Sequence, residues 1–230
     1  MGLFSGKAKR DFNDKEREKI LRELQHDTRN FSLSHIYAGL GRLVSGDHLK
    51  ATEVPFVVSG VIEAVSRKNL DEGLGIAIWS MTSMDNPDLR AMLADKTFSM
   101  IAQADKKNMK QMATVAMAAN ALASLAVPDS ETKKRAQREW LSAVDTLAAK
   151  KEGLSYAFAA ASNAAVGTGD MPLRKDAIDK WEEIVSRVAQ DDKATATAEA
   201  KRVTYGYQDF GQGAYDFRVR AANVWRKLIP

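Results

Sequence analysis

The segment AQREWLSAV at residues 136–144 decides the fold of this chain, because its pattern returns twice further on. It recurs as AIDKWEEIV at residues 177–185 and as AANVWRKLI at residues 221–229. In each copy an alanine stands four residues before a tryptophan, and a β-branched residue stands four residues after it. Residues spaced by four lie on one face of an α-helix, so a neighbouring helix can approach the large ring between its smaller flanking side chains.

Two phenylalanines, Phe56 and Phe98, extend this series toward the N-terminus. The aromatic positions are therefore 56, 98, 140, 181 and 225, in steps of 42, 42, 41 and 44 residues. A period of about 40–47 residues is typical of HEAT and armadillo helical arrays. One alternative stays open: five unrelated amphipathic helices, whose rings fall evenly because helix hairpins of similar length space them.

The apolar periodicity predicts helices throughout and no strand. Long, charged helices that carry the aromatic residues alternate with shorter, alanine-rich helices, such as those expected at residues 109–127 and 154–166. Small side chains permit close helix axes, so we expect the alanine-rich helices to have neighbours on several sides. The sequence predicts an all-α fold of about eleven helices, stacked as antiparallel pairs in a right-handed HEAT/armadillo/TPR-like superhelical solenoid.

The predicted domain organisation is simple. Residues 1–12 are expected to form a flexible basic arm, and Asn13 to open the first helix. Residues 13–230 are expected to form a single repeat domain with a period of about 42 residues. Within it, residues 13–46 form an atypical N-terminal pair and residues 205–230 a C-terminal cap, because solenoids need altered end units to cover their apolar ends.

Composition limits the possible functions. The 230 residues include no cysteine, which excludes disulfides, thiolate metal sites and cysteine nucleophiles and fits a cytoplasmic location. The net charge of +4 is mixed in sign rather than strongly basic. No apolar run reaches the roughly 18 residues of a membrane helix. Leu3, Phe4 and Lys7 allow at most a weak peripheral contact with an anionic membrane.

The segment QHDTRN at residues 25–30 is the strongest resemblance to a catalytic motif. His26 and Asp27, followed by Arg29 and Asn30, resemble the phospho-acceptor segment of sensor histidine kinases. The resemblance implies phosphotransfer through an exposed His26, assisted by Asp27, although Phe31 and Ser32 stand where that family has Pro-Leu.

The same His-Asp pair resembles that of the HD-type metal phosphohydrolases. Those proteins need further ligands on other helices, whereas all three histidines of this chain lie before residue 50, at positions 26, 35 and 48. Their spacing matches no familiar metal-ligand pattern. We therefore predict no metal site, no cofactor and no catalytic residue.

Two asparagines stand out in the alanine-rich helices. Asn120 and Asn163 lie 22 and 23 residues after Phe98 and Trp140, which are equivalent places in successive repeats. This arrangement resembles, in principle, the asparagine row with which armadillo-like arrays bind the backbone of an extended peptide. The alternative is that each asparagine packs or caps its own helix.

The densest aromatic stretch lies between residues 205 and 217. Tyrosine and arginine are favoured at binding hot spots, so this stretch is a second candidate contact surface. Its candidate residues are Tyr205, Tyr207, Phe210, Tyr215 and Arg218, with Arg202 and Arg220 alongside. The alternative is that these rings close the C-terminal end of the helix stack.

The repeat pattern favours a non-enzymatic scaffold or adaptor that binds another protein or an extended peptide on its alanine-rich helices. A nucleic-acid-binding HEAT-like protein is the alternative, and His26 phosphotransfer is a third hypothesis. The nucleic-acid hypothesis requires that one set of basic residues converge on a single surface. These are Lys133, Lys134, Arg135, Arg138, Arg174, Lys175, Arg218 and Arg220.

Overall fold

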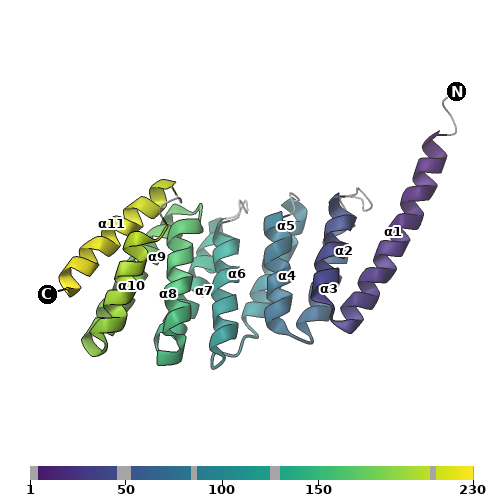
Figure 1. Ribbon diagram of the computed structural model, residues 1–230. Helices are drawn as coiled ribbons and strands as arrows, with labels where there is room; N and C mark the ends of the chain where they lie inside the picture. Colours follow the sequence, from purple (N-terminus) through teal and green to yellow (C-terminus); the bar gives the residue numbers. More distant parts are fainter. Residues whose placement is uncertain (1–4, 46–52, 84–86, 125–129, 208–210, 230) are drawn as a thin grey trace. The chain divides into compact units, whose positions relative to one another are not determined.

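The structure is a computed structural model that describes residues 5–45, 53–83, 87–124, 130–207 and 211–229. Over these ranges the chain forms eleven α-helices, one short 3₁₀-helix and no strand, which confirms the all-α prediction (Figure 1). The chain divides into two compact units, residues 1–103 and 104–230. The single repeat domain over residues 13–230 stays a prediction.

The first unit holds five helices. They are α1 (Ser5–Asn30), α2 (Leu33–Ser45), α3 (Val54–Ser66), α4 (Leu70–Ser83) and α5 (Pro87–Ile101). Helix α1 packs on α2 and α3, and α3 packs on α4 and α5. Gly73 allows the close approach of α3 and α4, because a Cβ there would lie 2.8 Å from the Cα of Ser66. Lys96 of α5 ties back to α3 by donating to the carbonyl and hydroxyl oxygens of Ser59, each at 2.9 Å.

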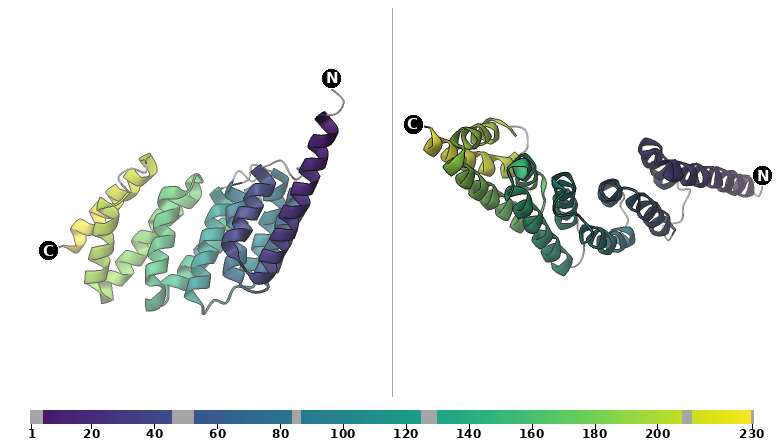
Figure 2. Two further views of the ribbon diagram at one scale, coloured as in Figure 1. Left: turned by 45° about the vertical axis from the view of Figure 1, so that its right-hand side comes forward. Right: turned by 90° about the horizontal axis from the view of Figure 1, so that it is seen from below.

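The second unit holds six α-helices. They are α6 (Met109–Ser124), α7 (Ser130–Ala148), α8 (Leu154–Gly167), α9 (Met171–Asp191), α10 (Lys193–Tyr205) and α11 (Gly211–Leu228), with the 3₁₀-helix at Lys151–Gly153. Helices α6, α8 and α10 form one layer, and α7 and α9 lie behind them (Figures 1 and 2). Helix α11 packs mainly on α10 and also contacts α8 and α9.

The alanine-rich helices belong to the core of this unit, as expected. Ala118 and Ala119 of α6, Ala161 and Ala164 of α8, and Ala200 of α10 are fully buried. The residues Asp170 and Asp192 start α9 and α10 as N-caps, since each carboxylate accepts a bond from a backbone N–H three residues on, at 2.9 and 3.0 Å.

Three of the five aromatic positions have the predicted environment. Phe98, Trp140 and Trp181 are buried, with 3%, 0% and 0% exposure, and the alanines four residues before them are buried as well. Val144 and Val185, four residues after the tryptophans, are fully buried. The pattern of a large ring between small or branched residues is therefore real in α5, α7 and α9, except that Ala102 is exposed.

The predictions for Phe56 and Trp225 are wrong. The buried stripe of α3 runs through Val54, Val58 and Ile62, so Val58 takes the core position and Phe56 is 75% exposed. Phe56 lies at the rim of a groove of about 370 Å³ between α1 and α3. In α11 the core stripe runs through Phe217 and Ala221, which leaves Trp225 half-buried at the side of the helix.

The N-terminal boundary also differs from its prediction. Helix α1 begins at Ser5 rather than at Asn13, inside the segment predicted as an arm. Leu3 and Phe4, proposed for membrane contact, lie outside the described residues, as do His48 and Phe210. Among the residues that the structure describes, no helix has the length and apolar character needed to span a bilayer.

Candidate partner-binding face

The helices α6, α8 and α10 present a row of side chains on the side away from α7 and α9. These side chains are exposed or half-buried, and together they define what we call the alanine face. Its members are Lys110, Thr114, Met117, Asn120, Tyr156, Ala159, Asn163, Ala198, Lys201, Arg202 and Tyr205. Most of these side chains are small or uncharged. Because they are accessible to solvent, a partner can contact them.

The two predicted asparagines lie on the neighbouring helices α6 and α8, each four residues before the last residue of its helix. The Ser124 hydroxyl donates to the Asn120 carbonyl oxygen at 2.7 Å and shares a 2.7 Å hydrogen bond with the Thr168 hydroxyl. These bonds set Asn120 about one helical turn below Thr168, which is the level of Asn163. Asn120 is half-buried and Asn163 is exposed. Both asparagines thus lie at similar levels of two adjacent helices.

An equivalent polar pair lies in the seam between α8 and α10. The Arg202 guanidinium donates to the Ser162 hydroxyl at 3.0 Å. Ser162 follows Asn120 by 42 residues, and Arg202 follows Asn163 by 39. The hydrogen-bonded pairs that join these helices are therefore Ser124 with Thr168 and Ser162 with Arg202.

Arg202 is held in place by a buried carboxylate. Its Nε and Nη2 donate to the two carboxylate oxygens of Glu199 at 2.7 and 2.8 Å. Glu199 is 9% exposed and also accepts from Trp181 Nε1 at 3.0 Å. The hydrogen bonds to Glu199 raise the pKa of Arg202 above its ordinary value. Arg202 is therefore a fixed part of the face, and much of its charge is already compensated by Glu199.

The aromatic stretch is divided between the alanine face and the end of the unit. Tyr205 is 55% exposed on the face, and its ring meets Trp225 edge-on with centroids 5.5 Å apart. Tyr207, at a φ of 57°, turns toward the buried Phe217 and accepts a hydrogen bond from Arg202 at 3.2 Å. Tyr207 and Phe217 thus help to close the end of the helix stack.

Two other predicted residues lie apart from the alanine face. Tyr215 is 58% exposed, on the side of α11 opposite Phe217. Arg218 donates to the Thr204 carbonyl oxygen at 2.9 Å, which ties α11 to α10. Phe210 lies outside the described residues. The aromatic stretch is therefore not one continuous surface.

The alanine face carries no exposed carboxylate. Glu199 is the one acidic residue in α6, α8 and α10, and it is buried against Trp181 and Arg202. Lys110, Lys193 and Lys201 are all exposed on these helices. The exposed charged side chains of the face are therefore all basic.

Helices α7, α9 and α11 are different, because they carry charges of both signs. Asp179 accepts from Lys175 at 2.7 Å and from Arg220 at 2.6 Å. Lys134 pairs with Glu131 at 2.9 Å, and Lys133 lies 3.8 Å from Asp170. Several of the basic residues expected to converge for nucleic acid are thus paired with carboxylates.

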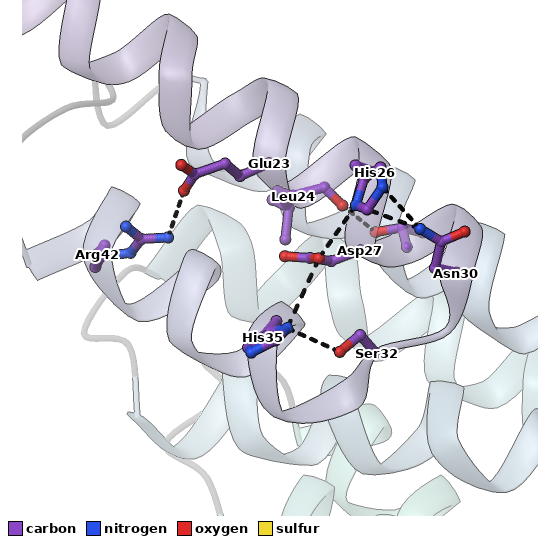
Figure 3. A network of polar contacts seen from close by, with 9 residues as sticks. Glu23, Leu24, His26, Asp27, Asn30, Ser32, His35 and Arg42 are labelled. Atoms are coloured by element: carbon purple, nitrogen blue, oxygen red, sulfur yellow. Dashed lines mark hydrogen bonds and ion pairs between the residues drawn. The ribbon is translucent and has the colours of Figure 1, made fainter.

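The histidine cluster lies at the corner between α1 and α2 (Figure 3). His26 is an exposed side chain whose Nδ1 lies 3.5 Å from Asp27 Oδ1, and His35 Nδ1 lies 3.8 Å from the same oxygen. Asn30 Nδ2 is 2.9 Å from His26 Nε2, and the Ser32 hydroxyl is 2.9 Å from His35 Nδ1. Both ring nitrogens of His26 thus have polar neighbours on α1, while the side chain itself is exposed.

Within the described ranges, no group of three His, Asp or Glu side chains is placed to hold a metal ion. The chain matches no known family model and no curated protein. The alanine face and the histidine corner are thus the two surfaces on which predicted site residues gather. Of these, the alanine face offers amide donors and acceptors, exposed rings and lysines across three adjacent helices.

Proposed function

We propose that this protein is a non-enzymatic scaffold or adaptor of the cytoplasm, built as a HEAT/armadillo/TPR-like array, that binds a protein or peptide partner on the alanine face. The observation that carries the proposal is the row of exposed or half-buried side chains on α6, α8 and α10, which includes Asn120, Asn163 and Arg202.

The repeat architecture is supported by the side-chain hydrogen bonds that tie equivalent helices together. Lys96 reaches back 37 residues to Ser59, and Lys68 reaches back 40 residues to the Thr28 carbonyl. In the second unit, Arg187 reaches back 39 residues to the Ala148 carbonyl at 2.6 Å, and Arg220 reaches back 41 residues to Asp179. These separations are close to the spacing of the aromatic positions, as stacked repeats require.

The composition of the face supports peptide recognition. Asparagine side chains both donate and accept, so they can pair with the C=O and N–H groups of an extended backbone. The exposed side chains of Ala159 and Ala198 are short, so a bound main chain can approach helices α8 and α10 closely. Tyr156 and Tyr205 are exposed rings of the kind enriched at interfaces.

The test is site-specific photo-crosslinking in cells. A benzophenone amino acid replaces Ala159 at the centre of the alanine face. The matched control carries the same group at Ser186, an exposed small residue of α9 in the other layer. We expect a defined protein adduct from position 159 that is weak or missing from position 186, and that survives nuclease treatment and high salt.

Two results would contradict the proposal. Equal adducts at both positions would mean that the face has no special role. An adduct at position 159 that disappears with nuclease would favour the nucleic-acid alternative, because phosphate contacts weaken steeply as salt rises.

A further inference from the structure

We infer that the partner of the alanine face is an acidic segment in extended conformation, bound across α6, α8 and α10. The inference rests on the proposed function and specifies its ligand. The inference is based on the distribution of charge over these three helices and on the short exposed side chains of Ala159 and Ala198.

The charges of the face favour a negatively charged ligand. Lys110 on α6 and Lys201 on α10 are exposed members of the face, and α8 between them carries no charged residue. Glu199 is buried and bound to Arg202, so it does not repel an incoming carboxylate directly. A peptide that crosses from α6 to α10 would meet a lysine on the first helix and another on the last, with Asn163 on α8 between them.

The dimensions favour a short, extended peptide. Adjacent helix axes are about 8–10 Å apart, so three helices span roughly 20 Å from the first axis to the last. An extended chain advances about 3.3 Å per residue, so about six residues cross the face. The exposed Ala159 and Ala198 project little, which permits the close approach that amide contacts need.

Peptide carboxylates suit this face better than a nucleic-acid backbone does. Duplex DNA carries one negative charge for about every 1.7 Å, and its binders place many cations along it. Here the face has one lysine on α6 and one on α10, and the guanidinium of Arg202 is already bound to Glu199. A few carboxylates on a peptide match this sparse set.

The experiment measures binding of a fluorescein-labelled peptide in which aspartate alternates with alanine over about twelve residues, roughly twice the span of the face. The test variant combines Lys110→Glu with Lys201→Glu. The control combines Lys134→Glu with Lys227→Glu, which changes the net charge equally at exposed positions of the other helices. Far-ultraviolet circular dichroism verifies that both double variants keep their helix content.

We expect the acidic peptide to bind the unaltered protein, and the test variant to weaken this binding about tenfold or more, since each reversal replaces an attraction by a repulsion. The control should change the Kd less than about threefold, and Asn163→Ala should weaken binding by a further few-fold through lost amide bonds. A serine–alanine peptide of equal length should bind more weakly, and added salt should reduce the difference.

Three results would overturn the inference. One is a Kd above about 1 mM for the acidic peptide with the unaltered protein. Another is equal weakening by the two double variants, which would indicate net charge rather than a site. The third is a single-stranded oligothymidylate that binds more tightly than the acidic peptide and responds to the same two lysines.

Crosslinking separates this inference from the proposed function. If position 159 captures a defined protein through a neutral or basic segment, then the acidic ligand is wrong and the adaptor function stands. If position 159 captures nothing beyond the Ser186 control, the proposed function itself fails.

Discussion

Trp140 of α7 and Trp181 of α9 occupy the same position in two copies of one sequence pattern, which we call the Trp140 repeat and the Trp181 repeat, and both are fully buried. Their indole N–H groups nevertheless have different surroundings. Trp181 Nε1 donates to Glu199, which follows it by 18 residues. Trp140 Nε1 has no hydrogen-bond partner among the described residues, and Phe158 stands 18 residues after it.

The difference shows that the repeat fixes the shape of the core but not its polar bonding. Both rings fit between small and branched neighbours, so both positions keep a tryptophan-sized side chain. A buried donor without a partner costs about 1–3 kcal/mol, which the Trp140 repeat must offset by apolar burial. The Trp181 repeat instead buries a carboxylate, and Arg202 compensates its charge. This same bond positions Arg202 on the alanine face.

The largest expected effect comes from Glu199→Leu, which gives the Trp181 repeat the apolar character of the Trp140 repeat. It leaves the Trp181 N–H unpaired and removes the carboxylate that holds Arg202. Because Arg202 is partly exposed and can turn to water, we expect a loss of about 2–4 kcal/mol in the free energy of unfolding, measured by urea denaturation. The matched change in the other repeat, Phe158→Leu, should cost about 1 kcal/mol. If Glu199→Leu costs no more than Phe158→Leu, then the hydrogen bonds of Glu199 to Trp181 and Arg202 contribute little to stability.

The next prediction tests whether the core packing of both repeats depends equally on a buried alanine. Ala160 in α8 and Ala200 in α10 are buried, so leucine at either position should overpack the core and cost about 1–3 kcal/mol. Leucine at the exposed Ala159 or Ala198 should change the free energy of unfolding by less than about 0.5 kcal/mol. Tolerance of Ala160→Leu alone would mean that the core of the Trp140 repeat is the looser one.

A smaller effect comes from replacing each tryptophan by phenylalanine. Both changes remove part of a buried ring, but Trp181→Phe also takes a donor away from Glu199. Trp140→Phe removes an unpaired N–H instead. We expect Trp181→Phe to be the more destabilising by about 1–2 kcal/mol in thermal or urea unfolding. The reverse order would indicate that Trp140 Nε1 has a partner, such as a buried water.

The flanking pattern correctly predicts buried rings in α5, α7 and α9, where the alanines four residues before Phe98, Trp140 and Trp181 are buried as well. The same pattern does not predict the core positions of α3 and α11. Phe56 and Trp225 share the spacing but not the burial. An aromatic residue by itself does not tell which side of a helix meets the core. In α3 the run of valines and isoleucine decides this, and it places Val58 inside.

The candidate face is only partly visible in the sequence. Asn120 and Asn163 stand out because amides are rare in alanine-rich helices. Arg202 lies 21 residues after Trp181 rather than 22 or 23, so counting from the aromatic positions misses it by one or two residues. The burial of Glu199 depends on Trp181 and Arg202, which lie on two different helices, and no local pattern reveals it.

The smallest expected effect concerns the outer link of the Trp181 repeat, where Asp179 of α9 holds Arg220 of α11. The hydrogen bond from Lys175 lowers the pKa of Asp179, and the charge of Arg220 lowers it further. A lowered folded-state pKa stabilises the protein above the unfolded pKa of about 3.9, and this stabilisation is lost as the pH falls through the folded value. Asp179→Asn should therefore cost less than about 1 kcal/mol at neutral pH, since the pair is partly exposed.

This cost should shrink as the pH falls below about 4, because protonated Asp179 then resembles asparagine. Urea unfolding at neutral and acidic pH measures it, with Asp191→Asn as a control at an exposed position of the same helix that should leave the neutral-pH stability unchanged. A cost that stayed constant with pH would mean that Asp179 acts through its shape rather than its charge. The link between α9 and α11 would then depend on packing around Phe217 and Trp181, whose rings meet edge-on with centroids 5.1 Å apart.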